Sequence, residues 1–135
     1  MSKPSTVLAV DAGTVRIGLA ISDETGTFAF PLEVIPAKNA IARIKALCEE
    51  RTVTQVIVGL PLTMKGDIGP EAARVEKFIR KLQRALQPLP VTAVDERLSS
   101  LVADRILESG KGHPKRDAVA AAVILESYLK TINDK

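Results

Sequence analysis

The chain has 135 residues, 46% of them hydrophobic and 26% charged, and these values are typical of one globular domain, expected here over residues 1–135. Its single cysteine, Cys48, excludes an intrachain disulfide and argues against a cysteine-based zinc site. The N-terminus lacks the pattern of a signal peptide, and no apolar run approaches the ~20 residues of a membrane helix, so we expect a cytoplasmic protein. The net charge of +3 favours a polyanionic partner only weakly.

Three runs of apolar and β-branched residues open the chain, and the short links between them predict an antiparallel meander. The runs are Val7–Val10, Ile17–Ser22 and Phe28–Ile35. Pro31 lies inside the third run and indicates a strand at the edge of a sheet, because proline has no N–H to donate. Asp11 follows the first run directly, so a carboxylate is expected at the end of a buried strand.

Helices and strands alternate in the rest of the chain. Apolar spacing predicts helices over Ala40–Cys48, Pro70–Leu86, a segment with Ser99 as N-cap, and Ala118–Leu129, and strands over Val53–Val58 and Val91–Val94. Crossover units after a meander predict an α/β fold, in which a mixed five-stranded sheet carries helices on both faces. In such sheets ligands gather beyond the carboxyl ends of the parallel strands.

The first of the three candidate catalytic acids, Asp11, begins the motif Asp11-Ala12-Gly13-Thr14. A carboxylate beside glycine can reach a metal ion while the backbone stays open to a bulky substrate. Magnesium suits such a site because it takes oxygen ligands and keeps waters and substrate phosphates in its shell. A polar turn between two strands accounts for the same residues. The pattern Asp-x-Gly-Thr also resembles the phosphate loop of actin-like ATPases and sugar kinases.

Further acids occur at two later positions. Asp95 and Glu96 follow the last predicted strand, so they are expected at the same end of the sheet as Asp11. Asp117 precedes Ala121 by four residues and shares a helical face with it, so packing of Ala121 on the sheet would aim Asp117 toward that end. Each of these acids can instead balance the dipole at a helix N-terminus, and the two interpretations stay open.

Basic residues near these acids are candidates for contacts with a phosphate backbone. They are Arg16, Arg97, Lys115 and Arg116. A second basic set, Arg74, Lys77, Lys81 and Arg84, forms a stripe on the predicted helix from Pro70. This stripe is either a solvated helix face or an electrostatic footprint for a polyanion.

Taken together, these motifs resemble the YqgF/RuvX family of pre-16S rRNA nuclease candidates and Holliday-junction-resolvase-like proteins. The resemblance runs from Val7 to Leu129 and rests on Val10–Gly18, Val58–Leu62 with Gly66 and Gly69-Pro70, Val94–Leu98, and Asp117 with Ala121-Ala122 and Ile124-Leu125. It implies an RNase H-like fold. It also implies a metal-dependent nuclease site in which Asp11, Glu96 and Asp117 hold Mg²⁺ or Mn²⁺.

The expected function is therefore an endonuclease that hydrolyses nucleic-acid phosphodiester bonds, in 5′-end processing of pre-16S rRNA. One or two metal ions would activate the attacking water and stabilise the leaving 3′ oxygen. The alternatives are a Holliday junction resolvase acting on branched DNA, a non-catalytic nucleic-acid-binding module, and a small phosphotransferase or ATPase lobe. The partner is pre-rRNA or branched DNA, and the sequence leaves open whether the chain works as a monomer or a homodimer.

Overall fold

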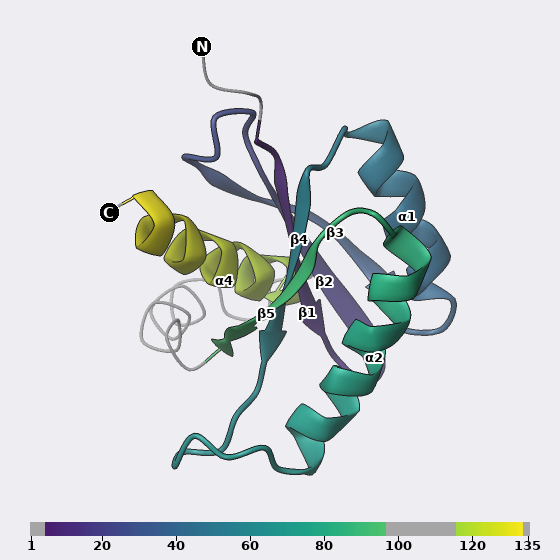
Figure 1. Ribbon diagram of the computed structural model, residues 1–135, viewed down its shortest axis with the longest axis vertical. Helices are drawn as coiled ribbons and strands as arrows, with labels where there is room; N and C mark the ends of the chain where they lie inside the picture. Colours follow the sequence, from purple (N-terminus) through teal and green to yellow (C-terminus); the bar gives the residue numbers. More distant parts are fainter. Residues whose placement is uncertain (1–4, 97–115, 134–135) are drawn as a thin grey trace.

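The structure is a computed structural model that describes residues 5–96 and 116–133. A central sheet is covered by α1 and α2 on one face and by α4 on the other (Figure 1). In chain order the elements are β1 (Val7–Ala12), β2 (Arg16–Ser22), β3 (Ala29–Pro36), α1 (Ala40–Glu50), β4 (Gln55–Leu60), α2 (Pro70–Leu86), β5 (Val91–Asp95) and α4 (Arg116–Asn133). The helix expected from Ser99 lies outside the described residues.

The sheet has five strands in the order β3-β2-β1-β4-β5. The first three strands form an antiparallel meander, and β1, β4 and β5 run parallel to one another. The expected α/β fold with a mixed five-stranded sheet is thereby confirmed. The third strand, which contains Pro31, lies at the sheet edge as its proline indicates. The carboxyl ends of the three parallel strands meet at one edge of the sheet.

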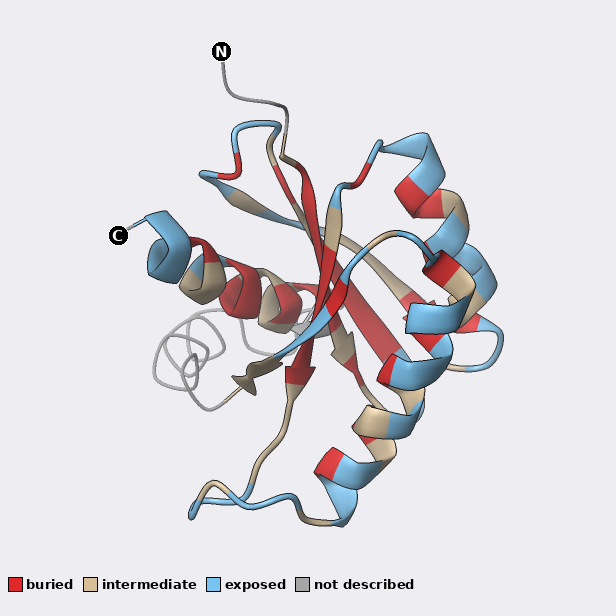
Figure 2. Ribbon diagram, in the orientation of Figure 1, coloured by how far each residue is buried: buried red, intermediate tan, exposed pale blue. Residues whose placement is uncertain are grey.

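Two apolar layers hold the helices to the sheet, because alternate residues of a strand point to opposite faces. Leu8 and Val10 of β1 pack on the side of α1 and α2, while Val7 and Ala9 pack on the side of α4. Figure 2 shows the buried residues along the inner strands and on the helix sides that face them. None of the helices in the described parts of the chain is long and apolar enough to cross a membrane.

Strand β4 differs from the expected range Val53–Val58, because it begins at Gln55 and continues to Leu60. Val53 follows the end of α1 and is bonded back to it, because its N–H donates to the carbonyl of Cys48 over 3.0 Å. At the other end, Gly59 pairs with Val94 and Leu60 with Asp95. The pairing with β5 therefore carries the strand two residues further toward the edge where the acids are expected.

Candidate active site

Three positions at the carboxyl ends of the parallel strands share one face of the sheet. Asp11 follows Ala9 by two residues in β1, and Ala9 packs against α4. Gly59 follows Ile57 by two residues in β4, and Ile57 belongs to the same apolar layer. Strand alternation therefore puts Asp11 and Gly59 on the α4 face. By the same alternation Glu96 belongs with Val94, which packs against that layer, and Asp95 belongs to the opposite face.

The Glu96 side chain lies over Gly59. A Cβ atom added at Gly59 would lie 3.6 Å from both Cγ and Cδ of Glu96, and 2.8 Å from Cδ1 of Ile124. No larger residue fits there without a shift of its neighbours. Because β4 lies between β1 and β5, the missing side chain at Gly59 leaves Glu96 the space to reach across β4 to Asp11. The one signal for this position in the sequence is a glycine that interrupts a buried β-branched strand.

Glu96 and Asp11 interact directly. Burial raises the pKa of Glu96 to about 7, and the charge of Asp11, a hydrogen bond with Asp11 and the more distant charge of Glu71 act in the same direction. The two carboxyl groups therefore share a proton up to neutral pH, since two adjacent anions repel each other. A cation placed between them would relieve the same repulsion. Their oxygen-only donor set fits Mg²⁺ or Mn²⁺, although the described residues contain no cluster of three or more metal-ligating side chains.

Helix α4 brings a third acid toward this edge. At the start of β4, Gln55 Nε2 donates a hydrogen bond to the hydroxyl of Tyr128 over 2.7 Å, and near the end of β4 Gly59 lies against Ile124. The helix therefore runs opposite to β4, with its N-terminus at the edge that holds Asp11 and Glu96. Asp117 is the second residue of α4, and its side chain lies outside the described part of the structure.

The chain matches the family model described as RuvX, Holliday junction resolvase, over residues 5–131. The chain belongs to the RuvX family. It is 43% identical over 136 residues to a protein of Roseiflexus sp. (strain RS-1) named "Putative pre-16S rRNA nuclease", covering 95% of this chain and 96% of that protein. A protein of Chloroflexus aggregans with the same name is 45% identical over 132 residues, covering 92% of each.

A solved structure supports the RNase H-like fold of this RuvX family member. T. thermophilus RuvC in complex with a Holliday junction substrate superposes with a TM-score of 0.58 at 20% identity, covering 96% of both chains. At that identity the likeness concerns the fold alone.

The basic residues proposed for phosphate contacts are only partly described in this RuvX chain. Arg16 is exposed at the start of β2, in the β1–β2 hairpin that follows Asp11. Arg116 is the first residue of α4, but its side chain is outside the described part, as are Arg97 and Lys115.

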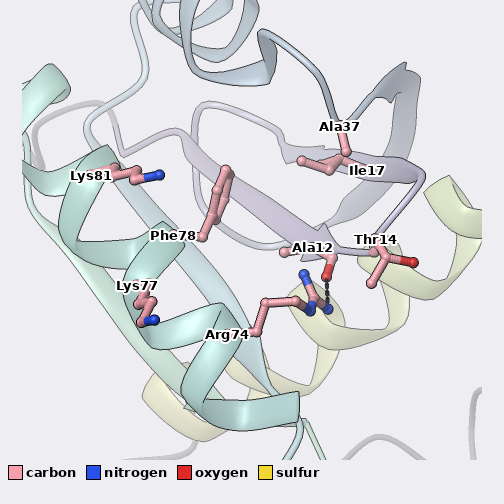
Figure 3. Close-up of a pocket in the computed structure, with 9 residues that line it drawn as sticks. Ala12, Thr14, Ile17, Ala37, Arg74, Lys77, Phe78 and Lys81 are labelled. Atoms are coloured by element: carbon pink, nitrogen blue, oxygen red, sulfur yellow. Dashed lines mark hydrogen bonds between the residues drawn. The ribbon is translucent and has the colours of Figure 1, made fainter. Parts of the chain in front are cut away.

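Arg74 of α2 lies closer to the site than the sequence indicated. Its Nη2 donates to the main-chain carbonyl of Ala12 over 2.9 Å and to the carboxylate of Glu71 over 2.7 Å. Ala12 is the residue next to Asp11, so Arg74 fixes the end of β1 from the α2 face of the sheet. Figure 3 shows this contact, in which the guanidinium group of Arg74 points toward the carbonyl of Ala12.

Proposed function

We propose that this chain is a metal-dependent endonuclease that hydrolyses phosphodiester bonds, with Asp11, Glu96 and Asp117 as its metal ligands. The observation that carries the proposal is the pair formed by Asp11 and Glu96 across Gly59, with the pKa of Glu96 raised to about 7. Carboxyl groups whose pKa is perturbed by burial and by one another are common at catalytic sites. The α4 N-terminus lies at the same edge, which supports Asp117 as the third ligand.

In the proposed mechanism Asp11 and Glu96 would hold the ion from the sheet, and Asp117 would hold it from the helix. When bound, Mg²⁺ or Mn²⁺ supplies Lewis-acid stabilisation of charge on the phosphate and lowers the pKa of the attacking water. Glu96 would release its proton to solvent when a cation binds, so that both carboxylates could act as anionic ligands. The buried Gly59 and the apolar side chain of Ile124 exclude solvent from beneath the pair. No serine or cysteine nucleophile is required by this chemistry.

The substrate we favour is pre-16S rRNA, cleaved in the cytoplasm. The relatives named for that RNA are 43% and 45% identical to this chain and match almost its whole length. The likeness to the junction-bound RuvC is limited to the fold. Branched DNA therefore remains the second candidate substrate, and a homodimer remains a prediction from the sequence.

A side-by-side cleavage assay tests this proposal. Purified protein with Mn²⁺ is incubated with a pre-16S rRNA fragment and, separately, with a four-way DNA junction. We expect cleavage of the RNA, loss of cleavage in EDTA, and a loss on the order of 10³-fold in Asp11→Asn, because that variant removes a central ligand. Cleavage of the junction alone would move the assignment to branched DNA. Equal activity of wild type and Asp11→Asn would contradict the proposed site.

A further inference from the structure

A cationic pocket lies on the face of the sheet opposite the carboxylates. It has a volume of about 310 Å³ and lies between α2 and the β1–β2 hairpin. The residues that matter for its chemistry are Thr14 of the hairpin and Arg74, Lys77, Phe78 and Lys81 of α2. Figure 3 shows the α2 side chains on one side of the pocket and the hairpin residues on the other. All three charged side chains that line it are basic.

No ion pair in the described part of the chain neutralises the charges of the two pocket lysines. Within residues 5–96 and 116–133, neither Lys77 nor Lys81 has an ion-pair partner, whereas Arg74 is paired with Glu71. Lys77 and Lys81 are four residues apart, so their side chains lie on the same face of the helix. Their ammonium groups therefore concentrate two positive charges at one opening, which raises the local concentration of anions.

Only part of the basic stripe on α2 lines the pocket. Arg84 belongs to the same stripe in the sequence and Arg80 lies between the two lysines, but neither lines the pocket. Arg80 directly precedes Lys81 and so points to a different side of the helix, whereas Arg84 lies in the last turn, beyond the residues that line the pocket. Of the two interpretations of the stripe, a footprint for a polyanion fits Lys77 and Lys81, and a solvated face fits Arg84.

The pocket and the carboxylate pair adjoin the same end of β1. Ala12 lines the pocket, and Asp11 is the preceding residue of the strand. Because consecutive side chains of a strand point to opposite faces, the two features lie back to back across one strand. A nucleic-acid strand that passes over the end of β1 can therefore present one phosphate to the acids and a neighbouring phosphate to the lysines.

We propose that this pocket is a subsite for one nucleotide unit of the substrate strand, adjacent to the scissile phosphate. Lys77 and Lys81 bind its phosphate, the Thr14 hydroxyl is available as a donor, and Phe78 offers an apolar surface for the sugar or base. The proposal rests on the proposed function, because the substrate class is taken from it. The subsite fixes the register of the strand over the acids and does not take part in the chemistry.

The test compares two double variants with the same change of charge on the same helix. Lys77→Ala/Lys81→Ala removes the pocket cations, and Arg80→Ala/Arg84→Ala is the matched control. Affinity for a fluorescently labelled single-stranded fragment of pre-16S rRNA is measured by anisotropy in EDTA, over a range of salt concentrations. All four side chains are exposed and alanine favours helix, so both variants should fold, which thermal melting verifies.

We expect the pocket variant to bind about tenfold more weakly and to lower the salt slope by about one unit, as the loss of one to two phosphate contacts predicts. The control should remain near wild type in both respects. Equal losses in the two variants, or none in either, would overturn the subsite. A stabilisation by ATP with Mg²⁺ that only the pocket variant loses, without the RNA effect, would also overturn it in favour of a free nucleotide.

The outcome is separable from that of the proposed function, because binding in EDTA requires no cleavage. If the wild type fails to cut any substrate but the pocket variant shows the selective loss of binding, the subsite stands and the nuclease assignment fails. If the wild type cleaves RNA and both variants bind alike, the nuclease assignment stands and the subsite fails.

Discussion

The two faces of the sheet present opposite charge at the same strand end. On the α4 face, Asp11 and Glu96 share a proton above Gly59. On the α2 face, Lys77 and Lys81 line a pocket with Arg74. The strand itself separates the two sets, since Asp11 and Ala12 are neighbours that point to opposite faces. The backbone of β1 thus holds acids and cations close together and still keeps the cations from neutralising the acids.

The largest effect is expected for Glu96→Gln on the acidic face. If Glu96 is a metal ligand, cleavage should fall by about 10²- to 10³-fold, because the amide binds a divalent ion weakly. The metal-free variant should be as stable as wild type or more so, since the repulsion from Asp11 is removed. Activity and urea unfolding in EDTA measure the two effects.

Asp95→Asn is the matched control for Glu96→Gln, because Asp95 belongs to the other face of the sheet. Its activity should stay close to that of wild type. The assignment of the face would be reversed if Asp95→Asn were inactive while Glu96→Gln cleaved normally.

The next effect comes from filling the space between the two acids. In Gly59→Ala the new Cβ would lie 2.8 Å from Cδ1 of Ile124, so the neighbours must move. We expect a loss of about 1–3 kcal/mol in the free energy of unfolding, partly offset by about 0.4–1 kcal/mol from the lower entropy of the unfolded chain. Displacement of Glu96 should lower cleavage by about 10- to 100-fold.

Ile124→Val removes the Cδ1 atom that the new methyl group meets, and it should restore stability in the double variant relative to simple addition. Strict additivity of the two changes, measured by urea unfolding, would show that the contact between position 59 and Ile124 does not limit the substitution.

A smaller effect is a pH dependence that only the acidic face should show. The pKa of Glu96 is raised from 4.5 to about 7, so between these values the folded state binds more protons than the unfolded state. The stability that the protonated Glu96 contributes to the folded state is fully present below about pH 4.5. It is lost as the pH rises through about 7. The metal-free protein should therefore lose stability over this window, and Glu96→Gln should lose less. Urea midpoints in EDTA would contradict this if the two profiles were parallel.

The smallest effect is expected at Arg74, which supports the strand end from the basic face. Arg74→Lys keeps the charge but loses the planar guanidinium group, whose Nη2 donates to both the Ala12 carbonyl and Glu71. Because the side chain is 36% exposed, we expect a loss of only about 1 kcal/mol in unfolding free energy and less than a tenfold loss of cleavage. Glu71→Gln serves as control, since it leaves the contact with Ala12 in place. A larger effect of Glu71→Gln would identify the ion pair as the important contact.

Local signals in the sequence predicted most of the fold. Helix α2 begins at Pro70 and ends at Leu86 as its apolar spacing indicates, because proline suits the first turn of a helix. Pro31 correctly indicated an edge strand. The predicted start of β4 was wrong by two residues. Val53 is buried and β-branched, as in a strand, but its main-chain N–H bonds to the end of α1. That choice depends on a contact which composition does not reveal.

The candidate site was harder to predict because it depends on contacts between distant residues. Strand ends indicated where the acids should gather, but the preference for Glu96 over Asp95 came from family resemblance. The structure distinguishes Glu96 from Asp95 by the pairing of Leu60 with Asp95. This pair extends β5 to Asp95 and so determines which face each of the two acids lies on. Likewise, nothing in the helical spacing separates Lys81 from Arg84. Only the position of the hairpin opposite α2 does so.

The sheet topology has a consequence for how the site forms during folding. Strand β1 carries Asp11 and pairs with β2 through a tight hairpin, whereas its other neighbour, β4, is about 48 residues away along the chain, as the pairing of Val7 with Gln55 shows. Local contacts form faster than distant ones, so we expect the meander to form early and the segment that ends at Glu96 to dock later. A partly unfolded state that keeps the meander would retain Asp11 without its partner. Slowly exchanging amides of β1 and β2 can then persist in molecules in which Asp11 has already lost its contact with Glu96.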